Sequence, residues 1–262
     1  MPEDAARSGA AMAPKERFTE RAGDYRKARP GYPDETLAFL FSHEGLGQPD
    51  TLADVGSGTG KLTGQILAAM PSLQRVYAVE PNADMRREAE SELGSDPRFV
   101  SVEGSGEATG LDGGSVDALT IAQAFHWFDF DRARAELQRV LRPSGRLALL
   151  WNLRLEDGDA FHRDYEHFLT TRGNGYEQVR ATWQVRHELG PLFASEPRMH
   201  RSEVIQSLDL AGLQARLASS SYAPTEPSAV AELGDLFERH QQGGRVTMRY
   251  ETVTYAGVVA PS

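Results

Sequence analysis

A glycine-rich loop is the segment of this sequence whose residue types and spacing point most directly to chemistry. The loop reads Asp54-Val55-Gly56-Ser57-Gly58-Thr59-Gly60 and lies between an alternating segment, 51–55, and a segment with helical spacing, 61–70. Glycines permit a tight turn and close approach of a ligand to the backbone, and the start of a helix offers unpaired N–H groups to an anion. We therefore predict a ligand site where this strand passes into this helix.

Three classes of ligand compete for such a loop. A nucleoside triphosphate loop needs Gly-x4-Gly-Lys-Ser/Thr, but Leu62 follows Lys61 here and Val55 stands where the first glycine belongs. A dinucleotide fingerprint needs a small residue three positions after Gly58, where this chain has Lys61. The Gly-x-Gly-x-Gly spacing is typical of a loop that binds S-adenosylmethionine (SAM). The remaining alternative is a glycine-rich turn without a ligand.

An acidic residue stands in register with this loop. Glu80 ends the second predicted strand, 75–80, and lies 20 residues after Gly60. An acid at this place can accept hydrogen bonds from both ribose hydroxyls of a nucleoside, whereas a surface glutamate at a strand end is the plain alternative. After the third predicted strand, 99–103, the turn Gly104-Ser105-Gly106-Glu107 offers its backbone to the edge of an adenine ring.

These segments together resemble a known family. The loop 54–60, Glu80, the turn 104–107 and the segment Arg139-Val-Leu-Arg-Pro-Ser-Gly145 are similar to class I SAM-dependent methyltransferases of the methyltransferase type 11 group. The segments Tyr25–Pro33 and Ala124–Phe128 resemble the branch that includes trans-aconitate methyltransferases. The resemblance covers residues 18–152 well. It implies SAM as the cofactor and S-adenosylhomocysteine (SAH) as the product.

The same resemblance implies a fold and a set of cofactor contacts. The fold is a Rossmann-like α/β sheet of seven strands in the order 3-2-1-4-5-7-6, with the last strand antiparallel, helices on both faces and a helical cap. Many relatives carry Asp where this chain has Ser105, so Ser105 or Glu107 must accept the adenine amino group. The implied cofactor-binding residues are Tyr25, Arg29, Asp54, Gly56, Ser57, Gly58, Gly60, Glu80, Pro81, Met85, Ser105, Gly106, Glu107 and Gln123.

The methyl acceptor is expected beyond the carboxyl ends of the strands, where ligands bind in open α/β sheets. Gln123 to Trp127 follow the fourth predicted strand and lie at that edge. His126 is the candidate general base, because imidazole exchanges a proton near neutral pH. The alternative is that His126 and Trp127 are packing residues at the start of a helix. Transfer to an acceptor that is already ionised needs alignment alone.

Arginines and aromatic residues from other segments complete the predicted pocket. In the resembling family, a segment like the one that holds Tyr25, Arg29 and Tyr32 folds over the cofactor as a lid. Arg29 is a candidate partner for the cofactor carboxylate or for an acidic substrate. Arg154 follows the fifth predicted strand and can bind a substrate carboxylate, although a solvated arginine is an equal alternative. We predict Tyr32, Trp127 and Arg154 as substrate-binding residues.

The elements that must position these residues follow from the spacing of apolar side chains. Strand and helix alternate up to residue 152, which indicates parallel βαβ units in an open sheet. We predict a disordered tail over 1–14 and a single domain over 15–262. Within that domain, 15–45 form the lid and 153–200 a helical cap. Beyond residue 200, the predicted elements are a strand at 201–206, helices at 208–219 and 228–240, and a final strand at 246–255.

Composition narrows the remaining classes. The chain of 262 residues has 28 Lys and Arg against 38 Asp and Glu, and a net charge of −10 argues against a nucleic-acid partner. It has no cysteine, no apolar run long enough for a membrane span and no secretory signal, so we expect a cytoplasmic protein, monomeric or homodimeric. The histidines of 162–200 lack metal-ligand spacing, and no metal site is expected.

The leading hypothesis is a SAM-dependent methyltransferase that transfers a methyl group to an O or N of a small molecule, with a carboxylate as one candidate. One alternative is an NAD(P)-dependent oxidoreductase on a similar sheet, which Lys61 disfavours. The other is a SAM-binding module without catalysis, acting through a partner.

Overall fold

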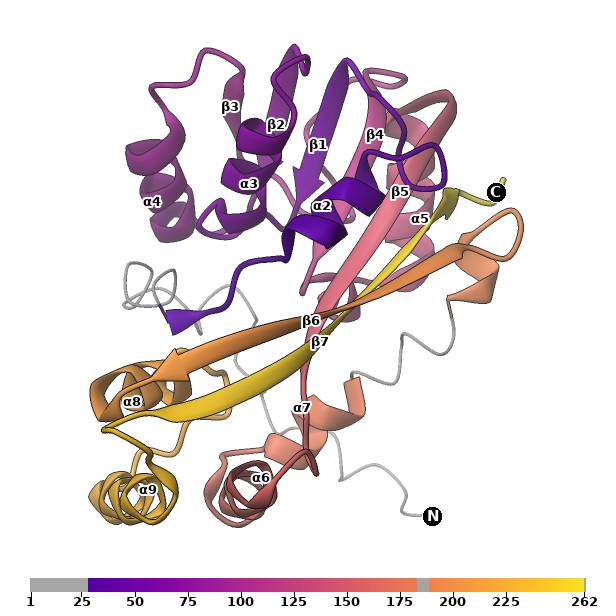
Figure 1. Ribbon diagram of the computed structural model, residues 1–262. Helices are drawn as coiled ribbons and strands as arrows, with labels where there is room; N and C mark the ends of the chain where they lie inside the picture. The colour runs from indigo at the N-terminus through magenta and orange to yellow at the C-terminus, as the bar shows by residue number, and fades with distance from the viewer. Residues whose placement is uncertain (1–27, 183–188, 262) are drawn as a thin grey trace, which may run out of the picture.

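Seven strands form one mixed sheet that organises the molecule (Figure 1). The computed structural model describes residues 28–182 and 189–261, so the predicted tail and Tyr25 lie outside the described residues. The sheet order is β3-β2-β1-β4-β5-β7-β6, and β7 runs antiparallel to both of its neighbours. The predicted order and the antiparallel last strand are therefore confirmed. The strands are β1 (Thr51–Val55), β2 (Arg75–Val79), β3 (Phe99–Val102), β4 (Val116–Ala122), β5 (Leu141–Arg154), β6 (Arg198–Leu208) and β7 (Val246–Val258).

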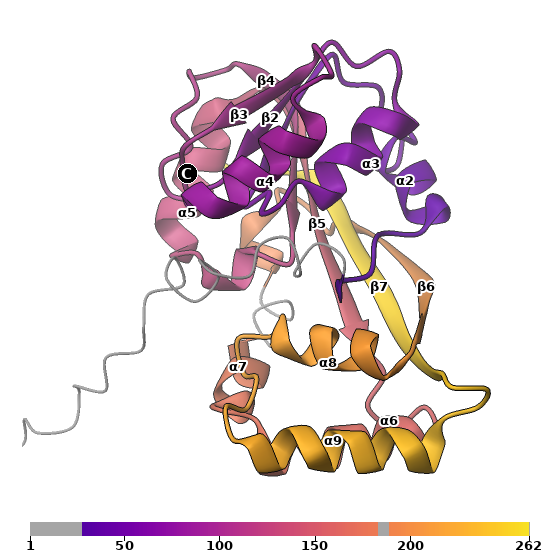
Figure 2. The same cartoon turned by 90° about the vertical axis from the view of Figure 1, so that its left-hand side faces the viewer.

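Helices cover both faces of this sheet (Figure 2). On one face lie α2 (Asp34–Leu40), α3 (Lys61–Ala69) and α4 (Ala83–Leu93), and α5 (Phe130–Val140) lies on the other. Leu40 and Ile66 are fully buried in the core beneath α2 and α3, and Leu137 is fully buried in the core beneath α5. The sheet is apolar on both faces, as a mainly parallel sheet must be.

A second group of helices packs around the far ends of β5, β6 and β7, which extend beyond the rest of the sheet (Figure 1). We call these four helices the helical cap. Their apolar side chains share one core, which includes Phe168, Leu213, Leu233 and Met248. The cap helices are α6 (Ala160–Arg172), α7 (Tyr176–Thr182), α8 (Leu210–Ala218) and α9 (Pro227–His240).

The cap differs from the predicted helical segment 153–200 in two ways. Residues 198–200 belong to β6, because they pair in register with residues 254–256 of β7. The helices α8 and α9 also belong to the cap core, although they follow β6 in the chain. Periodicity marked these helices correctly, but only the packing shows that they join α6 and α7.

Short polar side chains fix where several helices begin. The Asn82 side chain accepts hydrogen bonds from the N–H groups of Asp84 and Met85 and so caps α4. Asp129, Asp159 and Asp209 begin α5, α6 and α8 in the same way. These starts position the loops at the carboxyl ends of the strands. A membrane span would need a longer and more apolar helix than any that the described residues form.

Candidate active site

The glycine loop adopts a backbone that side chains disfavour. Gly56, Gly58 and Gly60 have φ angles of 72°, 56° and 73°. A Cβ atom on Gly56 would lie 2.6 Å from the Cβ of Ala124, and one on Gly60 would lie 2.8 Å from a methyl carbon of Leu93. The loop is therefore pressed between α4 and the residues after β4, and glycine is required at both contacts.

Asp54, which begins this loop, is fully engaged by the protein. Its carboxylate accepts hydrogen bonds from the hydroxyls of Thr63, at 2.6 Å, and Thr120, at 2.9 Å. Burial raises the pKa of Asp54 to about 6, although these hydroxyl bonds oppose the shift. The side chain ties β1 to α3 and β4 and so holds the loop in place.

Glu80 also holds the loop. One carboxylate oxygen accepts from the Gly58 N–H at 3.0 Å and the other from the Asn82 N–H at 2.9 Å. Burial raises the pKa of Glu80, and these backbone bonds and the charge of Arg86 work against that rise. Met85 is buried beside the loop, with its sulfur 3.8 Å from the position of a Gly58 Cβ. Pro81 is half-buried next to Glu80.

The turn after β3 has partners within the protein. The N–H of Ser105 donates to the carbonyl of Ala108 at 2.9 Å, and Glu107 accepts from the Asp129 N–H at 2.9 Å. A Cβ on Gly106 would lie 2.3 Å from the ring of Phe128, which covers this turn. None of the three predicted adenine contacts lines either cavity described below. Their role toward an adenine stays a prediction.

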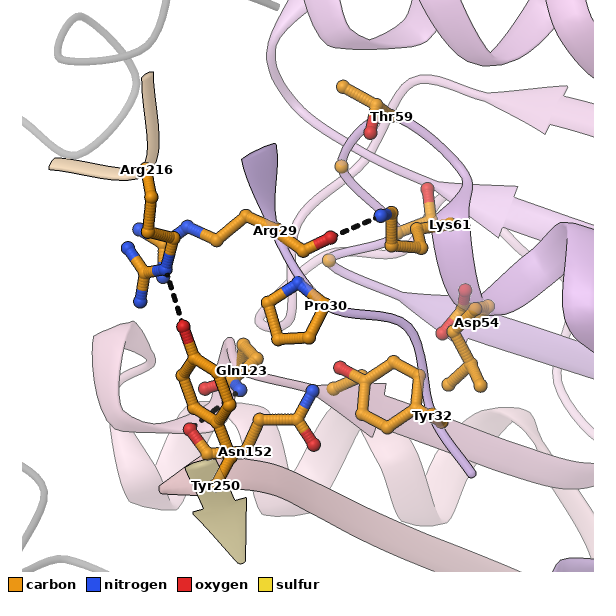
Figure 3. A pocket seen from close by; sticks show the side chains of 15 residues that line it. Arg29, Pro30, Tyr32, Asp54, Thr59, Lys61, Gln123, Asn152, Arg216 and Tyr250 are labelled. Carbon is orange, nitrogen blue, oxygen red and sulfur yellow. Dashed lines mark hydrogen bonds between the residues drawn. The ribbon is translucent and has the colours of Figure 1, made fainter. Parts of the chain in front are cut away.

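Two adjoining cavities lie at the carboxyl ends of β1, β4 and β5. We call the first the loop cavity, because the glycine loop forms one wall (Figure 3). We call the second the cap cavity, because residues of the cap line it. Both cavities are lined by Arg29, Gln123, Asn152 and Arg216. Further lining residues are Pro30, Tyr32, Lys61 and Tyr250 in the loop cavity, and His126, Trp127, Arg154 and Tyr222 in the cap cavity.

Arg29, Pro30 and Tyr32 line the loop cavity (Figure 3). The Gln65 side chain holds Tyr32 by accepting from its N–H at 2.9 Å and donating to its carbonyl at 2.7 Å. The Lys61 ammonium donates to the Arg29 carbonyl, and the Arg29 guanidinium donates to the Ser219 carbonyl at 2.9 Å. Tyr32 thus lines the loop cavity and not the cap cavity. Its predicted role beside a substrate stays a prediction.

Gln123 joins the two cavities and carries backbone strain. Its φ angle is 58°, which is uncommon for a residue other than glycine. Its N–H donates to the Leu150 carbonyl at 2.9 Å, and its side chain donates to the Asn152 carbonyl at 3.3 Å. Asn152 in turn donates from its side chain to the Gly31 carbonyl at 3.1 Å. Strain of this kind clusters at functional sites.

His126 lines the cap cavity in the short helix Phe125–Trp127, but its chemistry differs from that of a base near neutral pH. The Trp151 indole N–H points at its Nδ1 from 3.4 Å. Burial lowers the pKa of His126 to about 4. The imidazole is therefore neutral at pH 7 and accepts a proton poorly. The ring of Trp127 lies beside it, with 4.8 Å between the ring centroids.

Arg154 lines the cap cavity as predicted, yet its charge already has a partner. Its guanidinium forms an ion pair with Glu166, donates to the Tyr176 hydroxyl at 3.0 Å and stands 5.1 Å from the ring centre of Tyr165. A substrate carboxylate would have to compete with Glu166. The predicted role of Arg154 as a substrate-binding residue stays a prediction.

Several lining residues escaped prediction from the sequence. Asn152, Arg216, Tyr222 and Tyr250 come from β5, the end of α8 and its following turn, and β7. Arg216 is only 6% exposed, although most arginines on amphipathic helices face solvent. The sequence carries no local signal for this burial, because it depends on the cap closing over β7.

Comparisons with known proteins show what part of this chain is similar to. Residues 53–149 match the family model described as a methyltransferase domain. The chain is 40% identical over 139 residues to an uncharacterised methyltransferase of Mycobacterium tuberculosis, and the match covers 53% of each chain. It is 38% identical over 115 residues to a malonyl-[acyl-carrier protein] O-methyltransferase of Methylococcus capsulatus, covering 44% of this chain and 41% of that protein. The matches thus span about half the length of these relatives or less.

A solved structure agrees over a greater length. A protein described as a type II methyltransferase from Anaeromyxobacter dehalogenans aligns with 89% of this chain and 99% of its own, with a TM-score of 0.68 and 23% sequence identity. Residues 53–149 are therefore similar to a methyltransferase domain, and the chain shares the Rossmann-like fold of this solved structure. The trans-aconitate branch stays a prediction.

Proposed function

We propose that the chain binds SAM in the loop cavity and transfers its methyl group to a small molecule in the cap cavity. One observation carries this proposal: the two cavities meet at Gln123 and Asn152, at the carboxyl ends of β4 and β5. Two ligands in adjoining cavities are held in the close alignment that direct transfer needs.

The residues present fit SAM. The Ser57 hydroxyl is buried in the glycine loop and has no hydrogen-bond partner among the residues that the structure describes. The left-handed glycines keep the loop free of side chains that would fill the space of a ligand. Glu80 does not itself line the loop cavity, but it holds Gly58 of the cavity wall and has lone pairs beyond its two backbone bonds for ribose hydroxyls. Arg29 lines the same cavity and offers its charge to the methionine carboxylate.

When bound, SAM would supply a methyl group on a sulfonium sulfur: the acceptor would form the new bond to the methyl carbon as the S–CH3 bond breaks, and the sulfur would leave as the thioether of SAH. The residues of this chain then align the acceptor and exclude water. A carboxylate acceptor is already ionised at neutral pH and needs no base, which agrees with the low pKa of His126. One relative is by name an O-methyltransferase that acts on a malonyl group, and this supports a carboxylate oxygen as the target.

A nicotinamide oxidoreductase is less well supported. The place of the third fingerprint glycine is Lys61, whose ammonium is bound to the Arg29 carbonyl and closes part of the loop cavity. A catalytically silent SAM-binding module remains the alternative that an activity measurement must decide.

Turnover with a panel of small carboxylic acids, including trans-aconitate, tests the proposal. We expect SAH to form together with a methyl product that alkali releases as methanol, because esters hydrolyse and methyl ethers or methylamines do not. The matched control is the corresponding primary amide in place of each acid. SAM binding without turnover on any acid, amine or alcohol would favour the silent module.

A further inference from the structure

Arg216 is a buried charge that the described protein leaves without a counter-ion. Its Nε donates to the Tyr250 hydroxyl at 3.0 Å and its Nη1 to the Ser220 hydroxyl at 2.9 Å. Within residues 28–182 and 189–261, no carboxylate pairs with this guanidinium and no acceptor takes its Nη2. Burying a charge is costly unless an opposite charge or hydrogen bonds compensate it.

The position of Arg216 directs that charge into the site. It lines both cavities, and in Figure 3 its side chain and that of Arg29 extend toward each other. The two arginines are bound to adjacent residues, Ser219 and Ser220, so the turn after α8 fixes them together. Arg154 stands on the wall of the same cap cavity, but Glu166 already compensates it.

The tyrosines around Arg216 and its guanidinium affect each other's pKa values. Burial works to lower the pKa of Arg216, but the phenol groups of Tyr250, Tyr222 and Tyr165 outweigh it and raise this pKa, so the guanidinium stays charged. Burial works to raise the pKa of Tyr222, but the charges of Arg216 and Arg29 lower it below its ordinary value. Negative charge is thus favoured where Tyr222 meets the cap cavity.

We propose that Arg216 is the residue that binds an oxyanion of the methyl acceptor and selects acceptors for that charge; this inference rests on the proposed function. The planar guanidinium, oriented by Tyr250 and Ser220, presents its remaining N–H groups to a carboxylate or phosphate oxygen. In this proposal Arg29 binds the carboxylate of the cofactor. Arg216 therefore acts as a specificity-determining residue contributed by the cap.

The first experiment measures binding to the SAH-loaded full chain by calorimetry, with malonate and inorganic phosphate as the probes. We expect Arg216→Gln to weaken binding of the preferred probe at least tenfold and to change SAH affinity by less than twofold. Arg216→Lys keeps the charge but loses the paired N–H groups of the planar guanidinium, and we expect an intermediate loss of affinity for the probe. Arg172→Gln is the matched control, because Arg172 also lies on a cap helix but pairs with Glu232 in the open.

A second variant guards against loss of folding. Tyr250→Phe removes the hydroxyl that orients Arg216 and keeps the ring. We expect several-fold weaker binding of the probe, with a cooperative thermal transition that shows the variant still folds. Preference for malonate identifies a carboxylate acceptor and preference for phosphate a phosphorylated one, and either supports the proposal.

Three results would overturn it: probe affinity that does not depend on Arg216, no probe binding to the loaded wild type, or loss of SAH affinity with methylthioadenosine affinity kept. The last result would assign Arg216 to the cofactor carboxylate. Failure of the wild type to bind SAH would instead remove the proposed function itself.

Discussion

At the scale of single residues, the carboxylates of the site are structural groups as well as candidate ligands. Asp54 and Glu80 were predicted from their place around the glycine loop, and both take hydrogen bonds from the protein itself. Simple truncation of either residue would disturb the loop. To test whether one of these residues binds a ligand, the affinities of two related ligands must therefore be compared on the same variant, in addition to comparing the variant with the wild type.

For Glu80, we expect a change in the preference for ribose hydroxyls. The wild type should bind adenosine at least tenfold more tightly than 2′,3′-dideoxyadenosine, because two hydrogen bonds to an ionised acceptor contribute roughly 1.5–3 kcal/mol each. Glu80→Gln should remove most of this preference when both affinities are measured by calorimetry. Glu103→Gln, at an exposed ion pair with Arg86, is the control. An unaltered preference in Glu80→Gln would leave the residue with its loop contacts alone.

For His126, the low pKa predicts both a weak role in catalysis and a pH-dependent stability. The folded-state pKa of about 4 lies below the unfolded value of 6.5, so the unfolded chain binds the proton first as pH falls. The contribution of His126 to the free energy of unfolding is present above pH 6.5 and is lost as the pH falls from 6.5 to 4. A pKa shift of this size corresponds to a loss of roughly 3 kcal/mol.

Chemical denaturation of wild type and His126→Asn at pH 7 and pH 5 checks the stability. We expect a smaller pH dependence in the variant, and His167→Asn, at an exposed position on α6, should behave as wild type. Turnover of a carboxylic acid should fall less than tenfold in His126→Asn. A rate that rises through pH 6–7 and disappears with His126 would restore it as the general base.

At the scale of elements, the site depends on how the segment before α2 is held against α3. Gln65 makes two hydrogen bonds to the backbone of Tyr32, and this pair fixes residues that line the loop cavity. Residues 15–27 of the predicted lid over 15–45 lie outside the described residues, and closure over a ligand stays a prediction. Its described part is attached to the protein at Gln65, Lys61 and Ser219.

Gln65→Ala should loosen this attachment. Two hydrogen bonds at about 0.5–1.5 kcal/mol each are lost, so faster amide exchange at Tyr32 and several-fold weaker SAH binding are expected. Hydrogen exchange with mass spectrometry and calorimetry measure the two effects. Gln48→Ala is the matched control, since Gln48 makes an exposed hydrogen bond to the Phe41 carbonyl. Faster exchange at Tyr32 in Gln65→Ala with an unchanged SAH affinity would show that the segment has no part in binding.

At the scale of the whole molecule, three cores are arranged around two cavities. Two cores lie on the faces of the sheet and the third lies in the cap. Residues from the sheet side, such as Gln123, and from the cap, such as Arg216, meet only in the folded chain. A ligand that spans this junction binds the folded state alone.

Ligand-linked stability follows from this arrangement. SAH at one hundred times its dissociation constant should raise the free energy of unfolding by about 2.7 kcal/mol, whereas NAD at the same concentration should not. Differential scanning calorimetry with and without each ligand measures the shift. EDTA should leave the SAH effect unchanged, because no group of three potential metal ligands occurs among the described residues. Stabilisation by NAD instead of SAH would reverse the choice of cofactor.

The sequence by itself determined the parts of this protein that depend on local geometry. The glycine loop, the Asn82 cap and the alternation of strands and helices follow from backbone freedom, side-chain capping and apolar periodicity over a few residues. The sheet order came from the family resemblance that these segments carry, and the structure confirms it.

Only the tertiary structure decided the electrostatics of the site. The low pKa of His126 comes from burial, and the compensation of Arg154 comes from Glu166. The burial of Arg216, which has no counter-ion among the described residues, comes from the packing of α8 against Tyr250 of β7. Each effect depends on which distant side chains share a cavity and on how much water remains there. A charged residue, the residues that bury it and its counter-ion lie far apart along the chain, so no periodic pattern relates them. The sequence therefore showed which residues carry charge but not whether they are buried or paired.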